Sequence, residues 1–289
     1  MMTMYMRDDL FDSDGAKAWI DAHPDKSYNL SLRQLKRLPS NVKKYLIATE
    51  FDTAIAQALV QDRNTGVRQL IASRAFLSDY KQFVPRLMRD RSPLVRAELV
   101  RSIHDRDVNT ATVLDALRTD KDDTVRLAVA QHGREQDLDL FVTDKSASVR
   151  AVVALGRKDE HLDILVNDPD SRVRVAVARV GRDKDLDVLY EDYDAEVRAM
   201  VISHARPQDV ERMLSDDSWL VRQTVADNVD KIDEMLRVWS ITDENPVVRR
   251  TAMLHATELE LTHLVDDVDR EVPVHAGSFG YLQLLQVAR

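Results

Sequence analysis

Residues 168–192, DPDSRVRVAVARVGRDKDLDVLYED, contain the pattern that decides how this chain folds. Their Val-Arg pair, with an Asp five residues before the Val, recurs along the sequence at steps of 28, 30, 24, 24, 24, 24 and 27 residues. Such a repeat indicates short units that stack in a row, because no single unit covers its own apolar face. The pairs are Val67-Arg68, Val95-Arg96, Val125-Arg126, Val149-Arg150, Val173-Arg174, Val197-Arg198, Val221-Arg222 and Val248-Arg249. The matching acids are Asp62, Asp90, Asp120, Asp144, Asp168, Asp192, Asp216 and Asp243.

Each unit is predicted to begin with a helix. The position three residues before the Val always holds Ser, Asp or Asn, whose short side chains accept hydrogen bonds from the free N–H groups of a first helical turn. The Val and the residue four later share a helix face, and both are apolar in most units. Gly133 and Gly181 lie where this helix should end. The capping column is Asn64, Ser92, Asp122, Ser146, Asp170, Asp194, Ser218 and Asn245.

A second, shorter helix is predicted in each unit. Apolar residues recur 13 and 16 positions after the Val, as in Leu162 and Leu165 or Leu186 and Leu189. The segment covers only about two turns, which suits a short α- or 3-10 helix. We therefore predict an all-α solenoid of about eight to nine short two-helix repeats.

The pattern D-x-[S/D/N]-x-x-V-R-x-x-V-A with its 24-residue step resembles the leucine-rich repeat variant family, a short-repeat relative of the HEAT-like proteins. The resemblance covers about residues 40–267 and is best over residues 120–216. It implies a right-handed superhelix with alternating α- and 3-10 helices in the middle units. Some members of that family carry an iron–sulfur cluster on N-terminal cysteines. This chain has no cysteine, so that feature does not carry over.

The ends of the chain depart from the repeat. Residues 1–39 lack the motif and are predicted to form an N-terminal cap. The solenoid is predicted over residues 40–267, with Val42-Lys43 as a degenerate first copy. Residues 268–289 are predicted to form a C-terminal cap, since atypical end units cover the exposed core of a solenoid.

Composition narrows the function classes. The absence of cysteine excludes disulfides and thiolate metal sites and fits a reducing compartment. No secretory signal and no apolar run of membrane-spanning length is visible. We therefore expect a cytoplasmic protein that has no membrane contact.

The Arg and Asp columns are interpreted as structural. In a stack each column becomes a row, and an Arg can hold a carboxylate of the neighbouring loop with two parallel N–H groups. A second basic column, Arg134, Lys158, Arg182 and Arg206, is followed at close spacing by acids. We interpret it as pairing between units and as a source of solubility, rather than as a ligand track.

The sequence offers no convincing catalytic or metal-binding constellation. His132, His204 and His255 share one column, but two or more units separate them, so they cannot share a metal. Trp219, with Asp216 and Asp217 nearby, superficially fits a HEAT-like nucleic-acid-directed enzyme; packing across two units is the preferred explanation. We predict no enzyme activity, no cofactor and no metal.

The favoured function is a non-enzymatic protein-binding scaffold or adaptor that uses the concave face of the solenoid. Its partner, an unidentified protein, would contact the non-repeating positions six residues after each Val. Those positions are Arg101, Gln131, Leu155, Arg179, Ser203 and Asp227.

The alternative is binding of a nucleic acid or another polyanion by the basic N-terminal third. Residues 26–100 hold 14 basic and 6 acidic side chains, although the whole chain has a net charge of −9. The same charge pattern fits a solvated face that balances the acidic C-terminal half, or self-association of a basic end with an acidic end. The candidate anion-binding residues are Arg33, Lys36, Arg37, Lys43 and Lys44, which are followed by Arg63, Arg86, Arg89 and Arg91.

Overall fold

The computed structural model describes residues 13–22, 30–50, 52–77, 80–103, 108–204, 206–228 and 241–254. All regular structure within these ranges is helical, which confirms the all-α repeat architecture. The chain divides into two compact units, residues 1–141 and residues 142–289. None of the described helices is both long and apolar enough to cross a lipid bilayer. The predicted C-terminal cap, residues 268–289, lies outside the described ranges.

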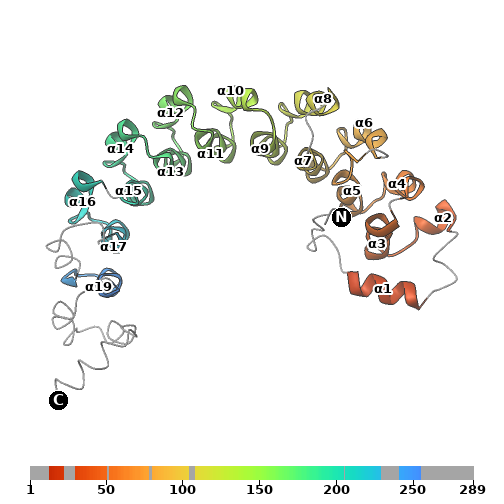
Figure 1. Ribbon diagram of the computed structural model, residues 1–289, viewed down its shortest axis with the longest axis horizontal. Coiled ribbons are helices and arrows are strands. Elements are labelled where there is room, and N and C mark those ends of the chain that lie inside the picture. Colours follow the sequence, from red (N-terminus) through yellow and green to blue (C-terminus); the bar gives the residue numbers. More distant parts are fainter. Residues whose placement is uncertain are drawn as a thin grey trace, which may run out of the picture. The chain divides into compact units, whose positions relative to one another are not determined.

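The first unit consists of two layers of helices (Figure 1). Successive helices of the first layer pack on one another, α1 on α3, α3 on α5, α5 on α7 and α7 on α9. These helices are α1 (Ser13–Asp21), α3 (Ser40–Glu50), α5 (Thr65–Ala72), α7 (Pro93–Arg101) and α9 (Asp123–His132). The second layer contains α2 (Leu32–Leu35), α4 (Thr53–Leu59), α6 (Val84–Leu87), α8 (Val108–Leu117) and α10 (Leu138–Phe141). The 3-10 turns η3 (Lys81–Phe83) and η4 (Glu135–Asp137) lead into α6 and α10.

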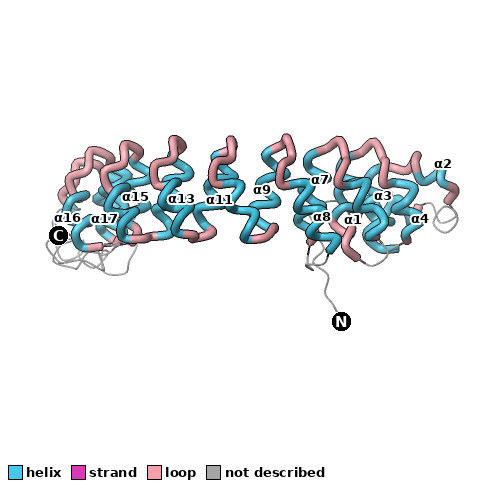
Figure 2. The backbone as a smooth tube through the Cα atoms, turned by 90° about the horizontal axis from the view of Figure 1, so that it is seen from above, coloured by secondary structure: helices cyan, strands magenta, loops and turns pink. Residues whose placement is uncertain are grey.

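The second unit repeats this plan. Its first layer is α11 (Ala147–Leu155), α13 (Ser171–Val180), α15 (Ala195–Ile202), α17 (Trp219–Asp227) and α19 (Pro246–Met253), each packed on the next. Its second layer includes α12 (Asp159–Leu165), α14 (Asp183–Leu189) and α16 (Pro207–Met213). Seen from above, the connecting loops of each unit gather along the edges of its layers (Figure 2).

The apolar columns form the core between the two layers. The Val of the Val-Arg pair has no exposed surface in any of the eight repeats. From the second layer, Leu162, Leu165, Leu186 and Leu189 are at most 1% exposed and close the core of their repeats. Burial of apolar surface on both layers therefore explains why the period of the sequence becomes the period of the structure.

The predicted caps stand at the starts of the first-layer helices. Asp122, Asp170 and Asp194 accept hydrogen bonds from the backbone N–H two residues later, at 3.0, 3.0 and 2.8 Å. The serines at this position, such as Ser92 and Ser218, have the same extended backbone but make no side-chain capping bond. The capping column therefore predicts the helix start in each case.

The second-layer helices of the middle repeats differ from the expectation of 3-10 geometry. α12, α14 and α16 are α-helices of seven residues each. Seven residues are enough for bonds of the α type, such as Val166 N–H to the Leu162 carbonyl at 2.9 Å. Among the described residues, the 3-10 helices are η3 and η4, both in the first unit.

Left-handed backbone marks two helix ends in the second unit. Gly181 ends α13 with a φ of +81°, as the glycine column predicts. A side chain added there would collide with the imidazole of His204, which forms a 2.8 Å hydrogen bond with the Ala178 carbonyl. One repeat earlier the same position is Arg157, with a φ of +62°.

Candidate binding surfaces

The Arg and Asp columns form a ladder of ion pairs along one loop edge of each unit. In the first unit Arg68 holds Asp90 with two hydrogen bonds, at 2.7 and 2.9 Å, and Arg96 holds Asp120 at 2.7 and 2.8 Å. In the second unit the same bidentate contact joins Arg150 to Asp168, Arg174 to Asp192, Arg198 to Asp216 and Arg222 to Asp243. The prediction that these columns tie one loop to the next is confirmed.

Each ladder residue is also bound within its own loop. Arg174 donates from Nη1 to the Asp168 carbonyl at 2.7 Å, and its guanidinium lies 4.3 Å from the centre of the Tyr193 ring. Asp192 accepts the Asp194 N–H at 2.8 Å, and both ladder side chains are about 5% exposed. Because these charged groups are buried and already hydrogen-bonded to each other, they are not available to a ligand. The ladder is therefore structural.

The first rung of the ladder contains a lysine. Lys43 directly follows the buried Val42 in the sequence. Its Nζ donates hydrogen bonds to the Asp62 carboxylate and to the Lys36 carbonyl, at 2.7 and 2.8 Å. This contact confirms that Val42-Lys43 is a degenerate first copy of the motif. It also corrects the anion-binding set, because a lysine 5% exposed and paired with a carboxylate does not offer its charge to a ligand.

A second row of ion pairs joins the second-layer helices. Arg182 binds the buried Asp185 at 2.6 Å and reaches back to Asp163 of the preceding repeat at 2.8 Å. Arg134 makes the matching contacts with Asp137 and Asp115, and Arg206 with Asp209 and Asp187. The expected pairing between units is therefore present at these three arginines.

The predicted partner-binding residues lie at the C-terminal ends of first-layer helices. Arg101 and Gln131 belong to the first unit, and Leu155, Arg179, Ser203 and Asp227 to the second. All are exposed except Arg101, which is half-buried with its Nη1 3.6 Å from Glu98. Leu155 is 46% exposed, so it is a surface residue and not part of the core. Four side chains of different chemistry thus form one surface row in the second unit.

The other candidate anion-binding residues lie at the start of the first unit. Arg33, Lys36 and Arg37 are exposed on and just after α2, whereas Lys44 is half-buried on α3. Lys36 lines a surface hollow of about 510 Å³, whose wall also includes Gln57, Gln61 and Arg63.

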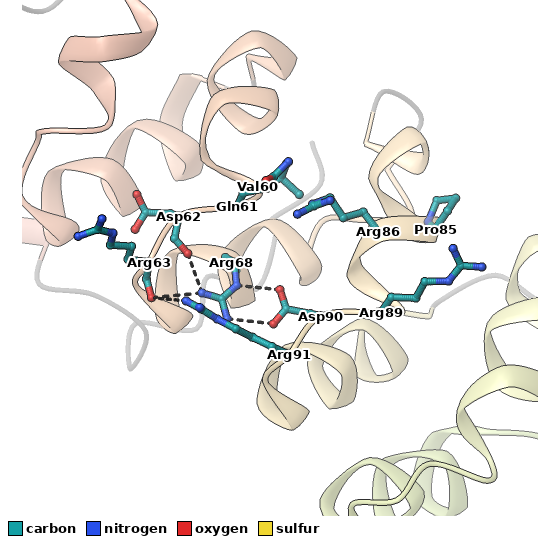
Figure 3. Close-up of a pocket in the computed structure, with 10 residues that line it drawn as sticks. All are labelled: Val60, Gln61, Asp62, Arg63, Arg68, Pro85, Arg86, Arg89, Asp90 and Arg91. Atoms are coloured by element: carbon teal, nitrogen blue, oxygen red, sulfur yellow. Dashed lines mark hydrogen bonds and ion pairs between the residues drawn. The ribbon is translucent and has the colours of Figure 1, made fainter.

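A second hollow of about 620 Å³ shares Gln61, Asp62 and Arg63 with the first. It is lined by Arg63 from the loop before α5, by Arg86 of α6 and by Arg89 and Arg91 from the loop after α6 (Figure 3). The sequence marks these arginines as part of the basic stretch, but it does not show that the fold brings them to one hollow.

The residues behind the enzyme hypothesis are Trp219 and the neighbouring acids. Trp219 begins α17 and is 45% exposed. Burial opposes ionisation of nearby Asp216, but its hydrogen bonds from Arg198 and from the Ser218 N–H outweigh this and lower its pKa. Asp216 is therefore a rung of the ladder. His255 lies outside the described residues, and no cluster of three metal-ligating side chains is found among those described.

Of the comparisons with known proteins, the one with solved structures identifies the fold. No model of a protein family matches the sequence, and no curated protein matches it. Among solved structures, a leucine-rich repeat variant with a novel repetitive protein structural motif matches 65% of this chain and 87% of its own chain. The two share 23% sequence identity and superpose with a TM-score of 0.50. The chain is thus an all-α repeat solenoid with the fold of the leucine-rich repeat variant.

Proposed function

We propose that this protein is a non-enzymatic binding scaffold that holds another protein along the C-terminal ends of its first-layer helices. The observation that carries the proposal is the row formed by Leu155, Arg179, Ser203 and Asp227 in the second unit. These side chains occupy one register of the repeat, and all four are exposed. Their chemistry changes from repeat to repeat, which a partner-specific surface requires and a stacking contact does not.

The rest of the repeat supports this assignment. The Val column is buried, and the ladder charges are matched within the fold. Positions that build the stack therefore keep their residue type, whereas the row is free to vary. Solenoids commonly present such non-repeating positions to their partners.

The test compares capture of proteins by the full chain and by a Leu155→Glu/Arg179→Glu variant. Both residues are exposed, so the variant should keep the melting temperature of the wild type. We expect a protein that the wild-type chain retains after nuclease treatment to be lost, or weakened at least tenfold, with the variant. Quantitative mass spectrometry of the retained proteins, followed by titration of the purified partner, measures the difference.

The matched control is Ile164→Glu. Ile164 lies in the second layer of the same repeat as Leu155 and is 55% exposed, so the substitution matches Leu155→Glu alone in charge and in exposure on a different face. The control should bind like the wild type. Equal loss in both variants, or retention by Leu155→Glu/Arg179→Glu, would remove the row as the site.

A second candidate function, binding of a polyanion, is favoured by the arginine-lined hollow of the first unit. It uses other residues than the row, so the two functions can be tested separately.

A further inference from the structure

The two acids of the arginine-lined hollow are already neutralised. Asp90 receives both arms of the Arg68 guanidinium, at 2.7 and 2.9 Å, and Asp62 receives Lys43 at 2.7 Å. Each carboxylate also accepts a backbone N–H, from Ser92 and from Asn64. The ladder therefore contributes no net charge to the hollow.

The other arginines that line the hollow carry positive charge that no carboxylate of the hollow balances. Arg63, Arg86, Arg89 and Arg91 are exposed, and none forms an ion pair with a carboxylate of the described residues. Among the described residues, the Arg91 side chain donates to the Arg63 carbonyl, at 3.3 Å (Figure 3). Four arginines thus line one hollow without a matching carboxylate among the described residues, so the hollow is positively charged and attracts anions.

The fold does not require these arginines. Arg63 and Arg91 directly follow a ladder Asp; this register is also basic in the next two repeats, as Lys121 and Lys145, but holds Pro169, Tyr193 and Asp217 after them. Those repeats have the same ladder contacts and the same buried Val. Arg63 and Arg91 are therefore not required for the ladder or for stacking of the repeats.

The arrangement suits a linear, multiply charged ligand. The 510 Å³ hollow adjoins the arginine-lined hollow at Arg63 and adds the exposed Lys36, so the cations follow successive repeats of one unit. Helices of neighbouring repeats pack about 8–10 Å apart, which spreads the charge along a line and not around one point. Arg binds phosphate oxygens through its planar fork, and several such contacts in a row match a sugar–phosphate backbone.

The lining argues against an acidic polypeptide. Protein partners are usually anchored by aromatic or aliphatic side chains in apolar pockets. Here Ala58 and Val60 are 8% and 3% exposed, which leaves Pro85 as the only apolar lining residue with substantial exposure in the two hollows. Neither hollow is lined by an aromatic ring, so bases have no stacking platform.

We propose that the hollow formed by Arg63, Arg86, Arg89 and Arg91 binds the phosphodiester backbone of a nucleic acid without reading its sequence. Contacts to phosphate carry no sequence information. With four phosphates neutralised, the affinity for a single strand should fall about 50-fold between 50 and 200 mM salt.

The experiment measures fluorescence anisotropy of a labelled, mixed-sequence single strand of about 20 nucleotides with the full chain. Wild type should bind at 50 mM salt, and an oligothymidine of equal length should bind within about threefold. Arg86→Glu/Arg89→Glu should weaken binding at least tenfold while the melting temperature stays unchanged, because both side chains are exposed. The matched control, Lys17→Glu/Lys145→Glu, reverses two exposed charges outside the hollow and should stay within about twofold of wild type.

Three outcomes would overturn the proposal. The first is absence of binding by wild type at 50 mM salt. The second is equal weakening by both double variants, which would mean a general charge effect. The third is equally tight, Arg86- and Arg89-dependent binding of a polyglutamate of matched charge, which would make the hollow a site for acidic polypeptides. The row at Leu155 and Arg179 is untouched by these variants, so the scaffold proposal is tested independently.

Discussion

At the scale of single residues, the helix ends of the second unit differ in the strain that they carry. Gly181 and Arg157 occupy the same register, and both have positive φ. A left-handed conformation costs a residue with a Cβ roughly 1–2 kcal/mol, a cost that glycine does not have. Arg157 therefore carries backbone strain that Gly181 avoids.

Gly181→Ala should lower the free energy of unfolding by at least about 1–2 kcal/mol, because it adds left-handed strain and a collision with His204. Arg157→Gly should raise it by up to about 1 kcal/mol, since relief of strain exceeds the entropy cost of glycine. Thermal and urea denaturation followed by circular dichroism measure both changes. The control is Gly156→Ala, whose φ of −68° any residue adopts; a loss there as large as at Gly181 would contradict the explanation.

Residue spacing alone predicts the ladder but not which charges remain available. Lys43 and Lys44 look equivalent in the sequence, yet Lys43 is buried against Asp62 and Lys44 is half-buried on α3. The position of Lys43 in the repeat predicts its pairing with Asp62, because Lys43 follows Val42 as every ladder Arg follows its Val. Arg86 and Arg89 belong to no repeated column of basic residues, so their position beside the hollow that Arg63 also lines depends on how α6 packs, which the sequence pattern does not specify.

At the scale of the helical element, the bidentate contact between repeats holds the start of one helix to the next loop. Removing one member of a buried ion pair leaves the other charge without compensation, at a cost of about 3–5 kcal/mol. Arg174 and Asp192 are both nearly inaccessible to solvent, so they belong to this class.

Arg174→Ala and Asp192→Ala should each destabilise the chain by about 3–5 kcal/mol, and the double variant by clearly less than their sum. A double-mutant cycle in urea measures the coupling. Arg172→Ala is the control on the same helix: its side chain is 68% exposed and pairs with Asp170, so its loss should cost about 1 kcal/mol or less. Additive losses at Arg174 and Asp192 would show that the ion pair does not couple the repeats.

The sequence predicts the first-layer helices better than the second-layer helices. First-layer helices carry a capping residue, a buried Val and a fixed spacing, so their starts follow from the sequence. Second-layer segments carry only two apolar positions three residues apart, which fit α and 3-10 geometry equally well. The choice is made by packing and by helix length, as the α-helical α12 and the 3-10 turn η4 show.

At the scale of the whole molecule, the carboxylates of the repeat make stability depend on acid. Arg172, opposed by partial burial, lowers the pKa of Asp170 to about 2. For Asp120 and Asp216, burial opposes ionisation, but hydrogen bonds from Arg96 and Arg198 and from the backbone prevail and lower the pKa. A carboxylate with a lowered folded pKa stabilises the fold above its unfolded pKa of about 4 and loses that contribution as pH falls through the folded value.

We therefore expect the melting temperature to decline as pH falls from about 4 towards 2. Asp120→Asn/Asp216→Asn should have a lower melting temperature than wild type at pH 7. The difference between the two melting temperatures should become smaller below pH 4, where the same carboxylates of the wild type are protonated. Melting curves at several pH values test this. A gap that stays constant down to pH 2 would mean that these two carboxylates do not titrate with folding.

A repeat such as residues 168–191 carries an Asp that pairs with the Arg of the preceding repeat and an Arg that pairs with the Asp of the next one, so the number of repeats can change. Excising residues 168–191 would bring Asp192 to the position of Asp168, 18 residues after Arg150, the separation that this Arg spans in the intact chain. Genes that encode such arrays can grow or shrink by whole repeats while every remaining joint is preserved. The length of the molecule can thus change during evolution while the buried core of each remaining repeat stays the same.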